Sequence, residues 1–255
     1  MTGSVAIFGG SGGFGEVTAR RIGAHTPVVI GYHSNEQRAE EIVTDINAKG
    51  GSATALPVDA CDPDSVQRFL RGANDAGDGL EGVVSTIGGF LKVRPLIELE
   101  TEDLRALLEI EVIGTFNIVK YSVPLLRDAG GGSIVVSSLS AIVLRTLEND
   151  AHTVAKGSVV NIIRFIAREA ARYNVRCNGL APGFIGGVGV AVSAAELPED
   201  IVGPAKGVIE QFMRQTPMGR PGTGEDVAVA IEFLLSPGAA YINGQIIAVD
   251  GGYTA

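Results

Sequence analysis

The chain has 255 residues, of which 45% are hydrophobic and 19% charged, a composition typical of a soluble globular protein. Its formal net charge of −9 argues against a general nucleic-acid or membrane-surface binder, because phosphate backbones and anionic lipids attract basic surfaces. The two cysteines, Cys61 and Cys177, lack metal-ligand spacing, so neither a metal site nor a disulfide framework is predicted. No apolar run reaches membrane-span length and the N-terminus lacks signal-peptide features, so we expect a cytoplasmic protein.

Short apolar, β-branched runs alternate along the chain with longer segments of helical periodicity. The apolar runs lie at 4–8, 27–32, 52–58, 81–86, 133–138, 174–181 and 244–250. The helical segments lie between them at 14–24, 35–48, 63–73, 101–128, 152–173 and 225–236. Buried strands separated by amphipathic helices imply right-handed βαβ units. The sequence therefore predicts an α/β, single-domain Rossmann fold over residues 1–255, with a doubly wound parallel seven-stranded sheet and helices on both faces.

The segment 186–210 is the one long interruption of this alternation. It lies between the sixth predicted strand and the last helix, and it is rich in glycine and other small residues. Long loops of this kind usually act as lids or are disordered. We therefore predict a substrate lid at 186–210, with a passive surface loop as the alternative.

A glycine-rich turn, FGGSGGFGE at 8–16, follows the first predicted strand and opens the first helix. Glycines leave room for a sharp turn and for a phosphate close to the backbone, and the helix N-terminus offers free N–H groups. This arrangement predicts a dinucleotide site, although such turns can also serve packing alone. The cofactor-binding residues of the turn would be Gly9, Ser11, Gly12, Gly13, Phe14 and Gly15.

The end of the second strand, GYHSNEQR at 31–38, bears on the choice between NAD and NADP. An Asp or Glu there would bind the adenosine 2′-hydroxyl and repel a 2′-phosphate, and neither Tyr32 nor His33 is acidic. A phosphate would instead meet the start of the next helix, where Ser34 is the expected N-cap. We predict NADP(H), against the alternative that Ser34 only caps and Arg38 only solvates this helix. The candidate phosphate partners are His33, Ser34, Asn35 and Arg38.

These motifs resemble the short-chain dehydrogenase/reductase family almost from end to end. Its T-G-x-x-x-G-x-G motif maps onto residues 8–15, with Phe8 in place of Thr, and LPVDACD at 56–62 resembles the turn whose Asp holds the adenine. VVSTIGG at 83–89 resembles the fourth strand with its N-N-A-G motif, and 176–185 and 217–252 resemble the family's last third. The further cofactor contacts implied by the resemblance are Asp59, Ala60, Thr86, Ile87, Gly88, Lys156, Pro182, Gly183, Phe184 and Ile185.

The positions that carry catalysis in that family have mostly changed here. His152 replaces the family's Tyr, which exchanges the substrate proton, whereas the Lys that holds the nicotinamide ribose is retained as Lys156. The Asn position holds Glu111, which we expect to be a structural or solvated carboxylate rather than an acid. The Ser position falls on Leu139, or on Ser138 if the alignment shifts by one residue. The longer Tyr-to-Lys spacing of enoyl reductases would need a Tyr at position 149, which is Asn.

Reduction of a ketone needs a hydride and a proton, and loss of the usual acid slows the reaction without removing hydride delivery. Three proton sources remain open. His152 is one, because an unperturbed imidazole is an acid near neutral pH, although Lys156 nearby disfavours the imidazolium. Ordered water, or the ribose hydroxyl held by Lys156, is the second source, and a phenol of the substrate itself is the third. The candidate catalytic residues are Lys156, His152 and Ser138.

The resemblance implies an NADPH-dependent ketoreductase that acts on a small-molecule ketone. The degenerate site favours a tailoring reductase of bacterial aromatic polyketide pathways, similar to the simocyclinone-type angucyclinone ketoreductases. The alternative is a catalytically silent NADP-binding protein that serves as a sensor or as a structural partner. Family members commonly form dimers and tetramers through the helices that match 101–128 and 152–173, so a homo-oligomer is implied.

Overall fold

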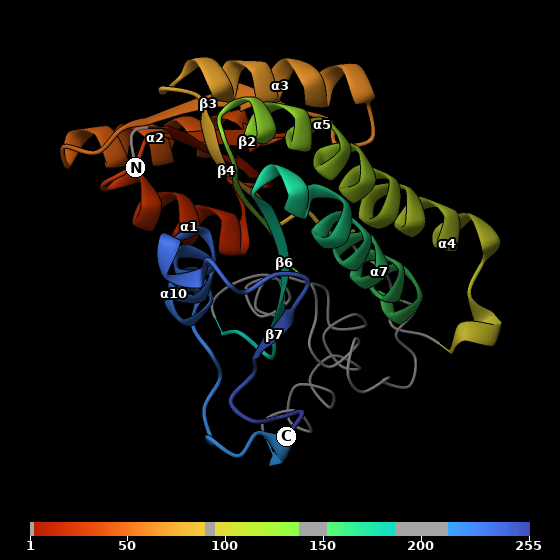
Figure 1. Cartoon of the computed structure of the whole chain (residues 1–255). Helices are drawn as coiled ribbons and strands as arrows, with labels where there is room; N and C mark the ends of the chain where they lie inside the picture. The colour runs from red at the N-terminus through yellow and green to blue at the C-terminus, as the bar shows by residue number, and fades with distance from the viewer. Residues whose placement is uncertain (1–2, 90–94, 138–151, 187–213) are drawn as a thin grey trace.

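A computed structural model describes residues 3–89, 95–137, 152–186 and 214–255 of the chain. These residues form a parallel sheet of seven strands in the order β3-β2-β1-β4-β5-β6-β7 (Figure 1). The predicted doubly wound, seven-stranded sheet is confirmed, and the apolar runs correspond to its strands. The strands are β1 Ser4–Phe8, β2 Val28–Tyr32, β3 Ala53–Pro57, β4 Leu80–Ser85, β5 Gly132–Ser137, β6 Val175–Pro182 and β7 Ile246–Val249.

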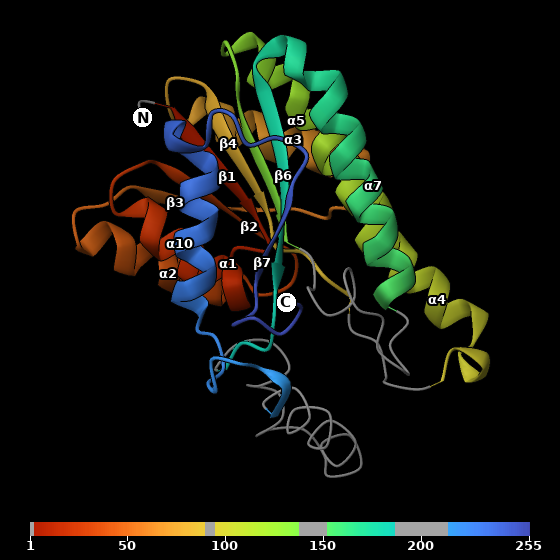
Figure 2. The same cartoon turned by 60° about the horizontal axis from the view of Figure 1, so that its bottom comes forward.

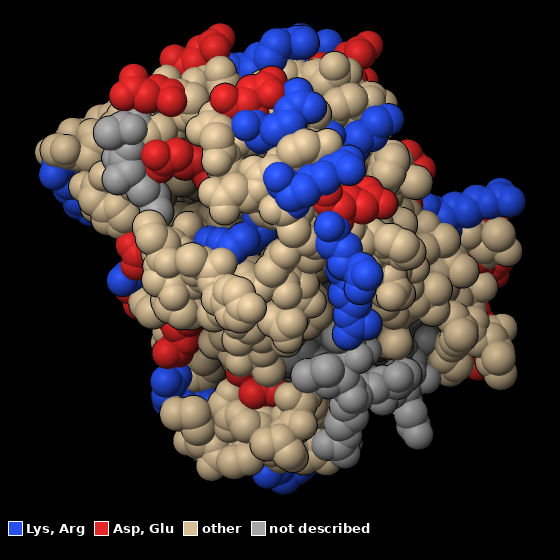
Figure 3. Space-filling view, in the orientation of Figure 1, with Lys and Arg blue, Asp and Glu red and all other residues tan. Residues whose placement is uncertain are grey.

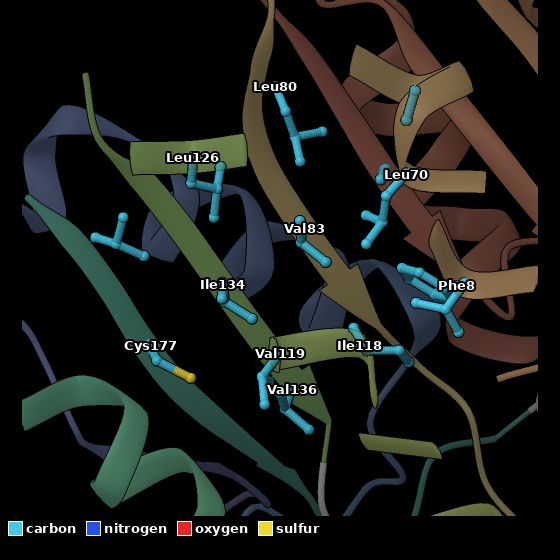
Figure 4. Close-up of a cluster of buried hydrophobic side chains, with 14 of the residues drawn as sticks. Phe8, Leu70, Leu80, Val83, Ile118, Val119, Leu126, Ile134, Val136 and Cys177 are labelled. Atoms are coloured by element: carbon cyan, nitrogen blue, oxygen red, sulfur yellow. The ribbon is translucent and has the colours of Figure 1, made fainter. Parts of the chain in front are cut away.

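Strand β1 shows how the sheet is buried on both faces. Successive side chains of a strand point to opposite faces, and Ala6 and Phe8 belong to one apolar cluster whereas Val5 and Ile7 belong to another. Figure 4 shows the first cluster, in which side chains from the strands and from the helices above them pack together. All five residues of β1 are buried. A strand covered on both faces is a continuous apolar run, which is why SVAIF predicts it.

Helices cover the two faces of the sheet (Figures 1 and 2). On one face lie α1 Gly13–Gly23, α2 Glu36–Ala48 and α10 Gly224–Leu235, whose buried side chains belong to the second cluster. On the other face lie α3 Pro63–Asp75, α5 Gly114–Asp128 and α7 His152–Ala170, and α4 Thr101–Leu108 packs against α7. Single 3-10 turns lie at Leu96–Glu98, Ala171–Tyr173 and Pro237–Ala239.

The segment 101–128 is predicted as one helix, but the structure divides it. A π-helical turn, Glu109–Ile113, separates α4 from α5. Single π turns within helices often occur at functional sites. Here the turn carries Glu111, which is only 1% exposed. The apolar periodicity of the segment does not reveal this turn, because one wider turn scarcely changes a pattern that repeats over many residues.

The order of the strands determines where a ligand can bind. Strand β1 pairs with β2 on one side and with β4 on the other, so the chain winds in opposite directions from β1. In such sheets, ligands bind outside the carboxyl ends of the strands, at the point where the order reverses. The predicted cofactor stretches at 9–15, 33–38 and 86–88 follow β1, β2 and β4, so all three meet at this edge.

The surface carries charges of both signs despite the net negative charge. Figure 3 shows Lys and Arg side chains gathered over the top of the molecule and along α7, with acidic side chains between them. Within the described ranges, no helix is both long enough and apolar enough to cross a membrane.

Candidate active site

The glycine-rich turn after β1 has the backbone geometry that its sequence predicts. Gly9 and Gly13 have φ angles of 75° and 40°, values that side-chain-bearing residues rarely adopt. A Cβ on Gly15 would lie 2.2 Å from the carbonyl oxygen of Gly9 and 2.8 Å from the Cα of Gly10. The absence of side chains therefore allows the start of α1 to lie directly against the end of β1.

The N-terminus of α1 fits an anionic group. Gly12 is the N-cap residue, and no side chain in the described part of the chain caps this end of the helix. A Cβ on Gly12 would meet no atom within 4 Å among the residues that the structure describes, so these residues leave space beside the first amides of the helix. Amides at a helix start and the positive end of its dipole attract a phosphate. Ser11 precedes the N-cap and Phe14 is the second residue of α1, so the turn offers the amide donors that a dinucleotide pyrophosphate requires.

At the start of α2, the structure corrects one prediction. Asn35, not Ser34, is the N-cap: its Oδ1 accepts a hydrogen bond of 3.2 Å from the amide of Arg38. Glu36 is the first helical residue, so the expected cap lies one position too early. His33 is mostly exposed, and its Nε2 lies 4.0 Å from Oδ2 of Asp59. The end of β2 and the turn after β3 therefore meet, as the predicted adenosine site requires.

Arg38 does not simply solvate its helix. Its guanidinium pairs with Glu16 through two hydrogen bonds of 3.0 and 2.7 Å, and with Glu41 through one of 2.8 Å. The hydrogen bonds that Arg38 donates to Glu41 and Glu16 raise the pKa of Arg38, so its guanidinium stays charged at any ordinary pH. Glu16 also accepts a 2.9 Å hydrogen bond from Arg20. Sequence reasoning missed Glu16, although it directly follows the last glycine of the turn.

The turn after β3 is fixed by a side chain that the sequence analysis did not single out. Oδ1 of Asp59 accepts a hydrogen bond of 2.8 Å from the amide of Cys61. Nδ2 of Asn117, in α5, donates to the carbonyl oxygen of Ala60 at 3.0 Å. Burial, followed by the nearby charges of Asp59 and Glu109, raises the pKa of the Cys61 thiol. This thiol therefore stays protonated near neutral pH, and the turn is held by backbone and amide contacts.

The residues after β4 lie against the glycine turn. Both the amide and the hydroxyl of Thr86 donate to the carbonyl oxygen of Phe8, each at 3.0 Å. A Cβ on Gly9 would lie 2.9 Å from the hydroxyl oxygen of Thr86. The predicted stretches at 9–15 and 86–88 are thus in direct contact.

Lys156 and Glu111 form a buried ion pair at the same edge. The ammonium of Lys156 contacts Oε2 of Glu111, and the two side chains are 8% and 2% exposed. The structural interpretation of Glu111 is confirmed, whereas a solvated carboxylate is wrong. Oε1 of Glu111 accepts a 3.0 Å hydrogen bond from the amide of Gly89, and the carbonyl of Gly89 lies 2.9 Å from Nε2 of His152. A polar network therefore connects α7, the π-helical turn and the segment after β4.

The remaining predicted residues are only partly described. Pro182 ends β6, and the amide of Gly183 donates to the carbonyl of Val249 at 3.0 Å. Ile185 pairs with Gly222 in a single parallel bridge, and Phe184 lies between these contacts. Ser138 and the predicted lid beyond Gly186, up to residue 210, lie outside the described residues. Within the described ranges, no group of three or more His, Cys, Asp or Glu side chains is placed to hold a metal ion.

The doubly wound sheet and the glycine turn are typical of dinucleotide-binding proteins, and comparisons with known proteins show the family. A family model described as enoyl-(acyl carrier protein) reductase matches residues 9–254. The chain belongs to the short-chain dehydrogenase/reductase family, a family of oxidoreductases that bind nicotinamide cofactors.

Similar proteins share nearly the whole length of the chain. It is 29% identical to a tropinone reductase homologue of Arabidopsis thaliana, over 97% of this chain and 88% of that protein. It is also 29% identical to a 3-oxoacyl-[acyl-carrier-protein] reductase of Synechocystis, over 99% and 97%.

Solved structures match the fold over comparable lengths. A short-chain dehydrogenase/reductase of Mycobacterium ulcerans superimposes with a TM-score of 0.88 at 28% identity, over 99% of this chain and 90% of that one. A 7α-hydroxysteroid dehydrogenase complexed with NADH and 7-oxo glycochenodeoxycholic acid gives 0.86 at 25% identity, over 98% and 93%.

Proposed function

We propose that this protein is an NADPH-dependent ketoreductase with an atypical active site, in which cofactor and substrate positioning does most of the catalytic work. One observation carries the proposal: an open, uncapped helix start suited to a pyrophosphate lies at the same sheet edge as a buried lysine. The relatives named as reductases of carbonyl compounds support it.

Different residues would bind different parts of the cofactor. The glycine turn and the start of α1 would bind the pyrophosphate, and the turn at Asp59 and Ala60 would hold the adenine. Lys156 would bind the nicotinamide ribose, because an ammonium has three donors and Glu111 occupies only part of this capacity. A bound nicotinamide supplies the hydride that the reduction needs. Residues 86–88 and Pro182–Ile185 would line its other end.

We propose NADP(H) as the cofactor, with Arg38 and His33 facing the 2′-phosphate. We expect Arg38→Ala to weaken NADPH binding about tenfold and to leave NADH binding nearly unchanged, because a hydrogen bond to a charged group contributes about 1.5 kcal/mol. Fluorescence titration with both cofactors measures this ratio. Glu16→Gln is the matched variant: it releases Arg38 from its bidentate partner, so NADPH should bind more tightly.

Equal weakening of both cofactors by Arg38→Ala would contradict the assignment. It would mean that the ion pair with Glu16 only holds α1 and α2 together.

The proposed substrate is a ketone on an aromatic polyketide in which a phenol lies next to the carbonyl. Such a phenol can supply the proton that the family's Tyr would otherwise provide, which suits a chain with His152 at that position. The test is NADPH consumption, followed spectrophotometrically, with a panel of phenolic polyketones and with non-phenolic ketones as controls. Turnover confined to the phenolic ketones supports the proposal.

The alternative function is a catalytically silent NADP-binding sensor or structural partner. The changed catalytic positions favour it, whereas the predicted lid at 186–210 favours an enzyme. Cofactor binding does not separate the two, because both retain it. Tight NADPH binding without turnover of any ketone in the panel would establish the silent protein.

We also propose that the protein is a cytoplasmic homo-oligomer, a dimer or a tetramer, that binds neither membranes nor nucleic acid. Helices α5 and α7 and the π-helical turn expose large apolar side chains, which a second copy of the chain would cover. Sedimentation velocity gives the number of subunits. These side chains are Ile110, Ile113, Phe116, Val154 and Phe165.

A further inference from the structure

Gly89 is held by side chains from two different parts of the fold. Its amide donates to Glu111 at 3.0 Å, and its carbonyl oxygen lies 2.9 Å from Nε2 of His152. Glu111 belongs to the π-helical turn, and His152 is the first residue of α7. The residue thus connects two helical elements that pack on the same face of the sheet.

Glu111 meets a donor at each of its two oxygens. Oε1 accepts from the amide of Gly89, and Oε2 accepts from the ammonium of Lys156. A carboxylate can accept at both oxygens, whereas an amide would turn an NH₂ group toward one of these donors. The carboxylate is therefore the side chain that both neighbours require, which explains a Glu where the family has Asn.

The contact between His152 and Gly89 requires a proton on Nε2 of the imidazole. A carbonyl oxygen only accepts hydrogen bonds, so the nitrogen 2.9 Å from the carbonyl of Gly89 must be protonated. That proton is engaged with the backbone. If His152 donated this proton to the substrate, its hydrogen bond to Gly89 would break. If His152 only holds Gly89 in place, the hydrogen bond stays intact.

The segment Thr86–Gly89 is consequently fixed at both ends. Thr86 is bound to the carbonyl of Phe8 at the end of β1, and Gly89 is bound to Glu111 and His152. A Cβ on Gly88 would lie 3.4 Å from Oε1 of Glu111, and one on Gly89 would lie 3.1 Å from Leu107. Gly89 is therefore closely packed against Leu107, whereas Gly88 leaves room for an ordinary contact with Glu111.

We propose that His152 and Glu111 are positioning residues that clamp Gly89 and so hold the segment Thr86–Gly89 beside Lys156. The clamp sets the place of the nicotinamide end of the cofactor, and His152 acts through the backbone rather than by protonating the substrate. The inference rests on the proposed function, in which residues 86–88 line the nicotinamide end of the cofactor.

The decisive comparison is between two substitutions of His152. The amide nitrogen of Gln can donate to the carbonyl of Gly89 in place of Nε2, but Gln does not titrate. We expect His152→Ala to lower kcat about 10–100-fold, because a displacement of about 1 Å costs up to roughly 10²-fold. His152→Gln should recover about tenfold relative to His152→Ala, the value of one hydrogen bond. Ser158→Ala is the control on the same helix, because the Ser158 hydroxyl donates to the carbonyl oxygen of Val154 within α7.

Two readouts would separate a clamp from an acid. Amide hydrogen exchange of residues 86–89, measured without cofactor or substrate, should accelerate in His152→Ala and return toward the wild-type rate in His152→Gln. The pH profile of kcat, measured with NADPH and a phenolic anthraquinone such as emodin, should have the same shape in the wild type and in His152→Gln.

Each unfavourable outcome has its own meaning. Equal loss of activity in both variants, together with loss of an alkaline limb near the imidazole pKa of about 6.5, would overturn the clamp and establish an acid. Unchanged exchange at 86–89 in His152→Ala would also overturn it. Failure of the wild type to bind NADPH would instead remove the proposed function, and the exchange result would still decide whether the clamp exists.

Discussion

Removing either partner of the Lys156–Glu111 pair is expected to destabilise the protein by about 3–5 kcal/mol, because it leaves a buried charge without a counter-ion. The side chains are 8% and 2% exposed, so water does not readily solvate the remaining charge. The variants are Glu111→Gln and Lys156→Met. Gln keeps an acceptor for the amide of Gly89, and Met approximates the volume of the lysine side chain.

The double variant, Glu111→Gln with Lys156→Met, should be clearly more stable than the sum of the two single losses predicts. Replacing both members of a buried pair removes the uncompensated charge, and coupling energies between contacting groups reach about 3 kcal/mol. Urea unfolding at one fixed protein concentration measures the cycle. Arg105→Ala is the control, since Arg105 pairs with Glu102 at a surface where both side chains are more than 70% exposed, at 73% and 78%.

Additive losses across this cycle would contradict the pairing, because independent sites add and contacting groups do not. The Lys156→Met variant also tests the proposed role of Lys156 in binding the nicotinamide ribose. Lys156→Met should weaken NADPH binding even where the protein remains folded, which a purely structural lysine would not do.

Gly15→Ala is expected to have the second large effect, on nucleotide binding. The new Cβ would lie 2.2 Å from the carbonyl oxygen of Gly9 and 2.8 Å from the Cα of Gly10. Both are backbone atoms, so α1 must move away from the end of β1. Loss of one or two amide hydrogen bonds to a phosphate costs about 3 kcal/mol, which corresponds to roughly 10²-fold in the NADPH Kd.

Isothermal titration with NADPH checks this expectation, and Gly157→Ala is its control. A Cβ on Gly157 meets no atom of the described residues within 4 Å, and alanine suits the interior of α7 better than glycine. This control should fold normally and bind the nucleotide as the wild type does. An unchanged Kd in Gly15→Ala would mean that the close approach of α1 and β1 is not needed for binding.

Strand β1 could be predicted from the sequence, whereas two local features of the helices could not. Residues 5–8 of SVAIF are all apolar, as expected for a strand that is buried on both faces, and alternate residues belong to different clusters. The π-helical turn at 109–113 and the N-cap at Asn35 could not be predicted with equal success. Both features depend on the backbone geometry of a few residues. Moving the cap by one residue, or widening one helical turn, leaves the apolar periodicity of the segment almost unchanged.

The candidate site divides in the same way. The sequence by itself determined the doubly wound fold and the glycine turn at 9–15, because burial, strand alternation and glycine geometry act through neighbours along the chain. Only the tertiary structure showed that Glu111 pairs with Lys156, that Arg38 is held by Glu16, and that Gly89 joins His152 to Glu111. These contacts connect residues that are 22 to 63 positions apart in the sequence. Which charged groups and hydrogen-bond donors reach each carboxylate therefore depends on how the helices pack on the sheet.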